Sequence, residues 1–185
     1  MIKLGAVLLI ILLLIIIAGI GAIYYVTIYN NYQEFIIRIN EVEGHIDNAI
    51  RDKFDCLSKS INVIKGNTDI KEEIFPEIVK LRSRKSSSFE LNRKLVDSVN
   101  EFYKIKEEHK ELNKSDAFKE IDNKLIEIED NLESYQEYYN STVTEYNKLV
   151  RSFPSNIIAK ICKYKEKTFF DGKDMNDEDV NDFKL

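Results

Sequence analysis

Two tyrosine–asparagine pairs, Tyr139-Asn140 and Tyr146-Asn147, are the residues whose types and spacing best fit a shared chemical task. On a helix with about 3.6 residues per turn, a spacing of seven places both tyrosines on one face, two turns apart. A buried tyrosine ring supplies contact area, but its hydroxyl group needs a hydrogen-bond partner. We therefore expect these side chains to fix the register of packed helices through buried polar contacts. A groove that binds a peptide or a helix is the functional alternative.

The sequence does not have the residue spacing that known metal sites and catalytic motifs require. A di-iron site in a helical bundle needs Glu-x-x-His on two helices, whereas Val42 stands three residues before His45 and Lys106 stands three residues before His109. The two histidines and two separated cysteines do not have the spacing of a zinc site. The chain also has no Gly-rich phosphate loop, nucleophile elbow or Cys-His catalytic signature. We therefore expect no catalytic residue, no metal, no cofactor and no enzymatic activity.

The composition is typical of a helical protein with few tight turns, because the 185 residues include two prolines and six glycines. The net charge is −5, and the acidic excess lies mostly after Phe170, which argues against a nucleic-acid partner. Cys56 and Cys162 could bridge in an oxidising compartment or stay as thiols. We interpret both as small apolar side chains that fill a core.

The element that must position everything else is the apolar run from residue 4 to residue 28, which contains no charged side chain. An apolar helix of roughly 20 residues crosses a bilayer, so this run can span with some tilt. Tyrosines favour the headgroup level, and three of them lie at the far end of the run: Tyr24, Tyr25 and Tyr29. A cleaved signal peptide, with its cleavage site among the small residues 18–22, is the competing interpretation. Because the run continues to Ile28, we favour an uncleaved anchor.

The anchor predicts a single-pass protein of the cell membrane that contacts the lipid bilayer through residues 4–28. Lysines and arginines near the run are too few to fix its orientation by the positive-inside rule. We expect a short cytoplasmic N-terminus and an extracytoplasmic domain.

Beyond the anchor, apolar residues recur every three or four positions, as they do on amphipathic helices. The first stripe continues the anchor to Gly66, a second carries Pro76, a third covers 91–112 and the longest begins at Phe118. Residues 82–91 leave open whether the chain forms a loop or a continuous helix. The pattern predicts an all-α fold, in which the transmembrane helix continues into an antiparallel up-and-down bundle of four helices, with three as the alternative.

The longest helix should end near Phe153, because the residue before Pro154 avoids α geometry. Ser155 is then expected to cap a short C-terminal helix. The segment 157–170 carries lysines among isoleucines and aromatic residues. It could lie on anionic lipid, but its apolar positions are few, so we favour a segment folded across the end of the bundle with its lysines in water.

The stretch YYNSTVTEYNKLVRSFPSNIIAKICKYKEKTFF (138–170) resembles the C-terminal signature of LemA-family bacterial membrane proteins: two Tyr-Asn pairs, a Phe-Pro-x-Asn turn, an apolar helix and a closing aromatic. Shorter matches lie upstream, at IYN (28–30), Ile46-Asp47, Lys53-Phe54-Asp55, Lys65-Gly66, Arg82, Leu112, Phe118 and Glu129. The chain departs from the family at Ser58-Lys59 and at His109-Lys110, and its serine-rich link is shorter. The resemblance implies a membrane-anchored antiparallel helical bundle and no known activity.

These observations give one set of expectations. Three segments are predicted: a transmembrane anchor (1–29), a LemA-like helical bundle (30–170) and an acidic disordered tail (171–185). The candidate polar network or partner groove comprises Asp55, Arg82, Glu129, Tyr139, Asn140, Tyr146 and Asn147, and the turn motif comprises Phe153, Pro154 and Asn156. We expect a non-enzymatic interaction or scaffold protein with an unidentified protein partner, and leave a homo-oligomer open. The alternative is an accessory subunit or signalling component of a membrane-associated enzyme or receptor complex.

Overall fold

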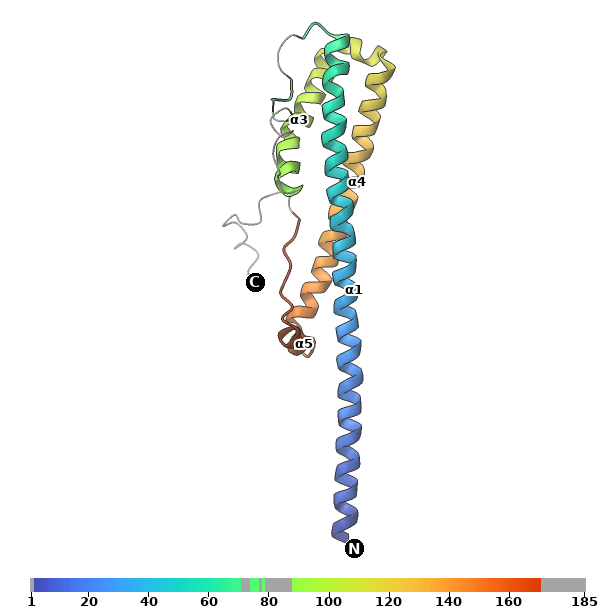
Figure 1. Cartoon of the computed structure of the whole chain (residues 1–185), viewed down its shortest axis with the longest axis vertical. Helices are drawn as coiled ribbons and strands as arrows, with labels where there is room; N and C mark the ends of the chain where they lie inside the picture. The colour runs from blue at the N-terminus through green and yellow to red at the C-terminus, as the bar shows by residue number, and fades with distance from the viewer. Residues whose placement is uncertain (1, 71–73, 77, 79–87, 171–185) are drawn as a thin grey trace. The chain divides into compact units, whose positions relative to one another are not determined.

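The computed structural model describes residues 2–70, 74–76, 78 and 88–170 (Figure 1). Within these residues the chain is all-α, with no strand. The elements are α1 (Ile2–Asn67), α3 (Ser88–Glu108), the 3-10 helix η1 (Lys110–Lys114), α4 (Asp116–Arg151) and α5 (Ser155–Cys162). The predicted all-α class, with a long apolar N-terminal helix that continues into the folded part, is therefore confirmed.

Several predictions fall on other residues. Arg82, most of the segment 82–91 and the acidic tail 171–185 lie outside the described residues. Of the second predicted helix, Ile74 and Phe75 are not helical, whereas Pro76 and Ile78 are. Pro76 is thus the first helical residue described in this segment, and its fixed φ suits a first helical position.

The chain divides into two compact units, which are described separately below. Unit 1 comprises Met1–Asn40 and Ser141–Lys167, and unit 2 comprises Glu41–Asn140 and Thr168–Leu185. The segment boundaries predicted after residues 29 and 170 stay predictions.

In unit 2, α1 and α4 pack side by side in opposite directions (Figure 1). Lys53 contacts Glu129, and three residues further along α1 the Cys56 thiol donates to the carbonyl of Ile121, so the numbering falls on one helix as it rises on the other. The apolar stripes of α1, α3 and α4 form the core between them. Its fully buried members include Ile50, Leu57, Ile64, Leu95, Phe102, Phe118 and Leu125.

The connection between α3 and α4 is a tight hairpin. The rings of Phe102 and Phe118 stack with centroids 5.3 Å apart, and Lys106 Nζ lies 2.6 Å from Asp122 Oδ2. The predicted third stripe ran to Leu112 as one helix, but α3 ends at Glu108. His109 leaves helical geometry with ψ 74°, and η1 then returns Leu112 to the core.

In unit 1, the first part of α1 packs with the end of α4 and with α5. A cis peptide bond joins Phe153 to Pro154 between the two helices. The predicted cap at Ser155 is wrong, because its hydroxyl donates to the carbonyls of Leu149 and Ser152 at 2.7 and 2.8 Å instead of bonding to α5. Both carbonyls lie at the C-terminal end of α4, where α4 itself has no N–H left to bond them. The serine therefore caps the end of α4 and not the start of α5.

The N-terminal part of α1 is the one helix among the described residues that is long and apolar enough to cross a membrane. Its most apolar stretch is not buried against any other part of the protein. The apolar side chains of Leu9, Leu13 and Ile23 are between 58% and 71% exposed. Exposing so many apolar side chains to water would be energetically unfavourable. The helix therefore fits a single-pass membrane anchor.

Candidate functional site

The Asn140 side chain on α4 binds the backbone of Phe170 in unit 2. Its Oδ1 accepts a hydrogen bond from the Phe170 N–H at 2.7 Å, and its Nδ2 donates to the Phe170 carbonyl at 2.8 Å. A side-chain amide carries one acceptor and two donors, so it can match both polar groups of one residue's backbone. This bidentate contact, here called the Asn140 clamp, holds the end of the described C-terminal segment (residues 164–170) on α4.

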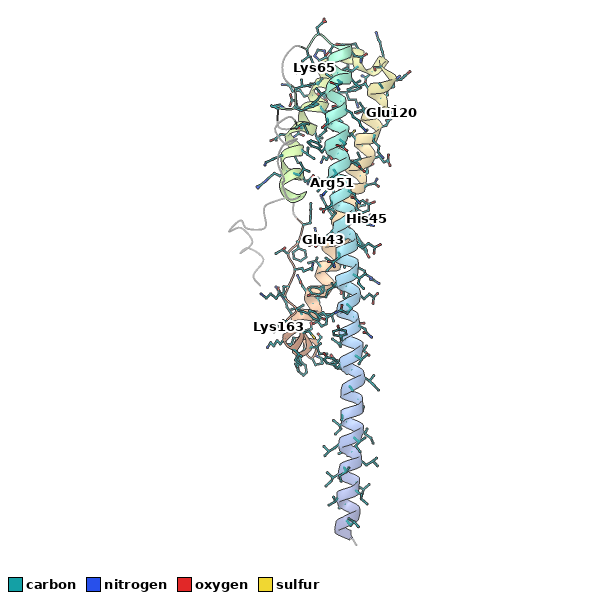
Figure 2. The ribbon with its side chains drawn as sticks, viewed as in Figure 1. Glu43, His45, Arg51, Lys65, Glu120 and Lys163 are labelled. Carbon is teal, nitrogen blue, oxygen red and sulfur yellow. The ribbon has the colours of Figure 1, made fainter. Side chains whose placement is uncertain are left out.

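Tyr139, beside the Asn140 clamp, is almost fully buried and contacts the same segment. Its hydroxyl lies 3.4 Å from the carbonyl of Thr168 and 3.3 Å from Glu43 Oε1, and its ring meets Phe170 edge to face. Burial raises the pKa of Tyr139 to about 12, and the neighbouring Glu43 carboxylate (labelled in Figure 2) adds to the shift. The hydroxyl therefore stays protonated and available as a donor at neutral pH.

Asn147 repeats the arrangement in unit 1. The Lys167 N–H donates to Asn147 Oδ1 at 2.9 Å, and Asn147 Nδ2 donates to the Lys167 carbonyl at 2.7 Å. Asn147 is only 9% exposed, so water competes little for these bonds. This contact is here called the Asn147 clamp.

Tyr146 belongs to an aromatic cluster in unit 1 with Tyr32 at its centre. Tyr32 is fully buried, and its hydroxyl lies 2.7 Å from the carbonyl of Leu149 and 3.3 Å from that of Ser155. Tyr146 meets the Tyr32 ring edge to face at 5.9 Å, and Tyr164 packs against it at 4.8 Å. Burial raises the pKa of Tyr32 and of Tyr146. The cluster ties α1 to the end of α4.

The turn motif follows this cluster. The Asn156 N–H donates to the carbonyl of Ser152 at 2.8 Å. Phe153 is 80% exposed, so its ring is not part of the protein's own core.

Glu129, in unit 2, pairs with a buried lysine. Lys53 is 3% exposed, and its Nζ lies 2.5 Å from Glu129 Oε1 and 3.4 Å from Asn92 Oδ1. Asp55, two residues further along α1, is exposed. The structure therefore does not bring Asp55 into the expected network with Glu129, because the helical period points the two side chains of Lys53 and Asp55 in different directions.

Among protein families, the LemA family model matches residues 43–182 of the chain. The chain belongs to the LemA family. The match contains both clamps and the Lys53–Glu129 pair and leaves out the apolar run at residues 4–28. No curated protein matches the chain.

Four polar residues of this LemA-family chain have site roles that were not expected from its sequence: Tyr32, Gln33, Lys53 and Asn92. The Gln33 amide donates to the Tyr164 hydroxyl at 2.6 Å. A signal for Lys53 does exist, because it falls in phase with Ile50 and Leu57 on the apolar stripe of α1, where a solvated lysine would not be placed. Tyr32 likewise opens that stripe.

The chemistry of these contacts is recognition of peptide backbone. Amide and phenol groups that meet N–H and C=O groups hold a segment in place without regard to its side chains. Cys56 and Cys162 are free thiols. Burial raises the pKa of Cys56, which keeps it a thiol and a poor nucleophile. Within the described ranges, no group of three or more His, Cys, Asp and Glu side chains could hold a metal ion.

Proposed function

We propose that this LemA-family chain is a membrane-anchored, non-enzymatic interaction protein. Residues 4–28 hold it in the cell membrane, with the folded part on the extracytoplasmic side, and the helical units present a rigid surface to a protein partner.

The main support for this proposal is that the motif side chains are bonded to other parts of the protein itself. Asn140 and Asn147 are engaged with the backbone of the C-terminal segment, and Glu129 is engaged with Lys53. Preorganised active sites instead aim such groups at a space where substrate can react. Side chains that fix packing are what a stable scaffold needs, since satisfied polar networks rigidify a fold.

A partner is best sought at apolar side chains that remain exposed in unit 2. Val96 on α3 and Ile126 on α4 are 46% and 42% exposed. Each has an exposed charged neighbour, Asp97 and Glu127, which points about 100° away around its helix. These neighbours serve as matched controls.

A photoreactive phenylalanine analogue placed at each of the four positions in intact cells tests the proposal. We expect a discrete crosslinked adduct that depends on irradiation at Val96 or Ile126 and is weaker at the charged neighbour. The absence of an irradiation-dependent adduct from all four positions would count against a partner on this surface.

The second candidate, an accessory subunit or signalling component, is favoured by the continuity of α1. This single helix runs from Ile2 to Asn67 without a break, so the membrane part and the folded part share one continuous element. The same adducts distinguish the two roles. A crosslinked enzyme or receptor whose activity falls when this chain is deleted would support the accessory role.

A further inference from the structure

Exposed apolar side chains lie on the outer side of α5 and just before its start, in unit 1. Phe153, Ile157 and Ile161 are 80%, 50% and 64% exposed. Ile157 and Ile161 stand four residues apart on one side of α5, whereas Ile158 and Ala159 are buried on its inner side. An aromatic ring and two isoleucines gathered around one short helix need a cover other than water.

The position of α5 along α1 indicates that the lipid bilayer covers these side chains. The Cys162 sulfur, at the end of α5, lies 3.8 Å from the Tyr25 hydroxyl. A hydrocarbon layer of about 30 Å takes roughly 20 helical residues. A span that begins at Leu4 therefore leaves the hydrocarbon just before Tyr25. The end of α5 thus lies at the headgroup level, within the same compact unit as the anchor.

The chain reverses at this level. Lys163, labelled in Figure 2, adopts left-handed geometry with φ 58° and ends α5. The next residue, Tyr164, already packs on Tyr32, which stands about 10 Å further along α1 than Tyr25. Ile161 and Lys163 are therefore at the part of the turn nearest to the lipid.

The charges around α5 suit an anionic surface. Lys160, Lys163 and Lys165 are exposed. The single carboxylate between residues 152 and 167 is Glu166, whose Oε2 lies 2.5 Å from Arg151. Lysines that flank an apolar face are typical of helices that lie in a membrane interface.

We propose that Phe153, Ile157 and Ile161 insert into the headgroup region of the bilayer that holds the anchor, with Lys160, Lys163 and Lys165 on anionic lipid. The protein then contacts the membrane twice, through the spanning helix and through α5. This second contact fixes the angle at which α1 leaves the bilayer. It also reverses the expectation that segment 157–170 meets only the protein and water.

The chain contains no tryptophan, so one introduced indole reports on its own surroundings. The full chain with Ile161→Trp is placed in nanodiscs of mixed phosphatidylcholine and phosphatidylglycerol, with and without brominated acyl chains. We expect blue-shifted emission that the brominated lipid quenches strongly. Ile157→Trp is the second variant if Ile161→Trp does not keep its helix content.

Ile37→Trp is the matched control, because Ile37 is 63% exposed on α1 in the same unit and about 18 Å beyond Tyr25. Its emission should stay red-shifted and unquenched. Emission of the Ile161→Trp variant that matches this control overturns the proposal. So does a blue shift without bromine quenching, which would mean that a second protein copy covers the face. Quenching that is equal in pure phosphatidylcholine would overturn the role given to the lysines.

Discussion

The Asn147 clamp allows the sharpest prediction, because one substitution removes two defined hydrogen bonds and little else. Asn147→Leu keeps the approximate size of the side chain but loses the bonds of 2.9 and 2.7 Å to Lys167. A net intramolecular hydrogen bond contributes about 0.5 to 1.5 kcal/mol, so two bonds at a nearly buried residue should contribute about 2 kcal/mol. We expect the C-terminal segment to open locally by that amount.

Limited proteolysis reads this opening directly. Trypsin can cut after Lys165 only when the segment leaves the protein, and cleavage then follows the population of the open form. A loss of about 2 kcal/mol corresponds to a roughly 30-fold faster cleavage of the full chain in nanodiscs. The cut site is identified by mass spectrometry.

Asn123→Leu is the control for this experiment, since Asn123 is exposed on the same helix. Its cleavage rate after Lys165 should equal that of the unmodified chain. If Asn147→Leu and Asn123→Leu were cut at the same rate, the clamp would not hold the segment and the reasoning would be refuted.

Four further substitutions test the buried polar contacts. Glu129→Ala should destabilise the fold by about 2–3 kcal/mol in denaturant unfolding followed by circular dichroism, because it leaves the Lys53 ammonium buried without its carboxylate. Lys53→Met should cost less, about 1 kcal/mol, since an apolar side chain suits that position on the stripe and the Glu129 side chain, 36% exposed, can reach water. Tyr32→Phe should lose about 1 kcal/mol with its hydrogen bond to Leu149. Finally, the folded pKa of Tyr139 lies above the usual 10, at about 12, so its contribution to stability is fully present below pH 10 and is lost as the pH rises towards 12. Tyr139→Phe should flatten that alkaline decline.

Each of these has a result that would contradict it. Equal losses from Lys53→Met and Glu129→Ala would mean that Lys53 is held by something other than the carboxylate. A Tyr32→Phe chain as stable as the parent would remove the role given to the hydroxyl. An alkaline decline that is unchanged in Tyr139→Phe would place the responsible group elsewhere.

The helices could be predicted because their apolar residues keep a helical period over many turns. The stripe from Tyr32 to Ile64 leaves few alternatives to a single helix, and α1 ends at Asn67, one residue beyond the expected glycine. The end of α3 was harder to predict from the sequence, because the apolar periodicity continues through His109 although the backbone there is no longer helical.

The partners of the polar residues could not be predicted. Periodicity places Asn140 and Asn147 on a helix face, but it carries no signal for an aperiodic segment such as 164–170, whose backbone they bind. The choice between Asp55 and Lys53 as the neighbour of Glu129 likewise depends on side-chain direction. The phase of Lys53 with Ile50 and Leu57 was the available signal.

The hydrogen-bond partners of Ser155 could not be predicted from the sequence either. Serine is a usual helix cap, and nothing in the local sequence says that its hydroxyl will turn back to the carbonyls of Leu149 and Ser152. Those bonds form because the chain folds back between the two helices and leaves the start of α5 close to the end of α4.

A spanning helix that stays attached to the folded units underlies every role proposed above. The most direct test is mass spectrometry of the chain recovered from carbonate-washed membranes. We expect the peptide covering residues 4–28 to be present in the membrane-bound chain. A mature chain that begins after Ala22 and is released by the carbonate wash would contradict the anchor.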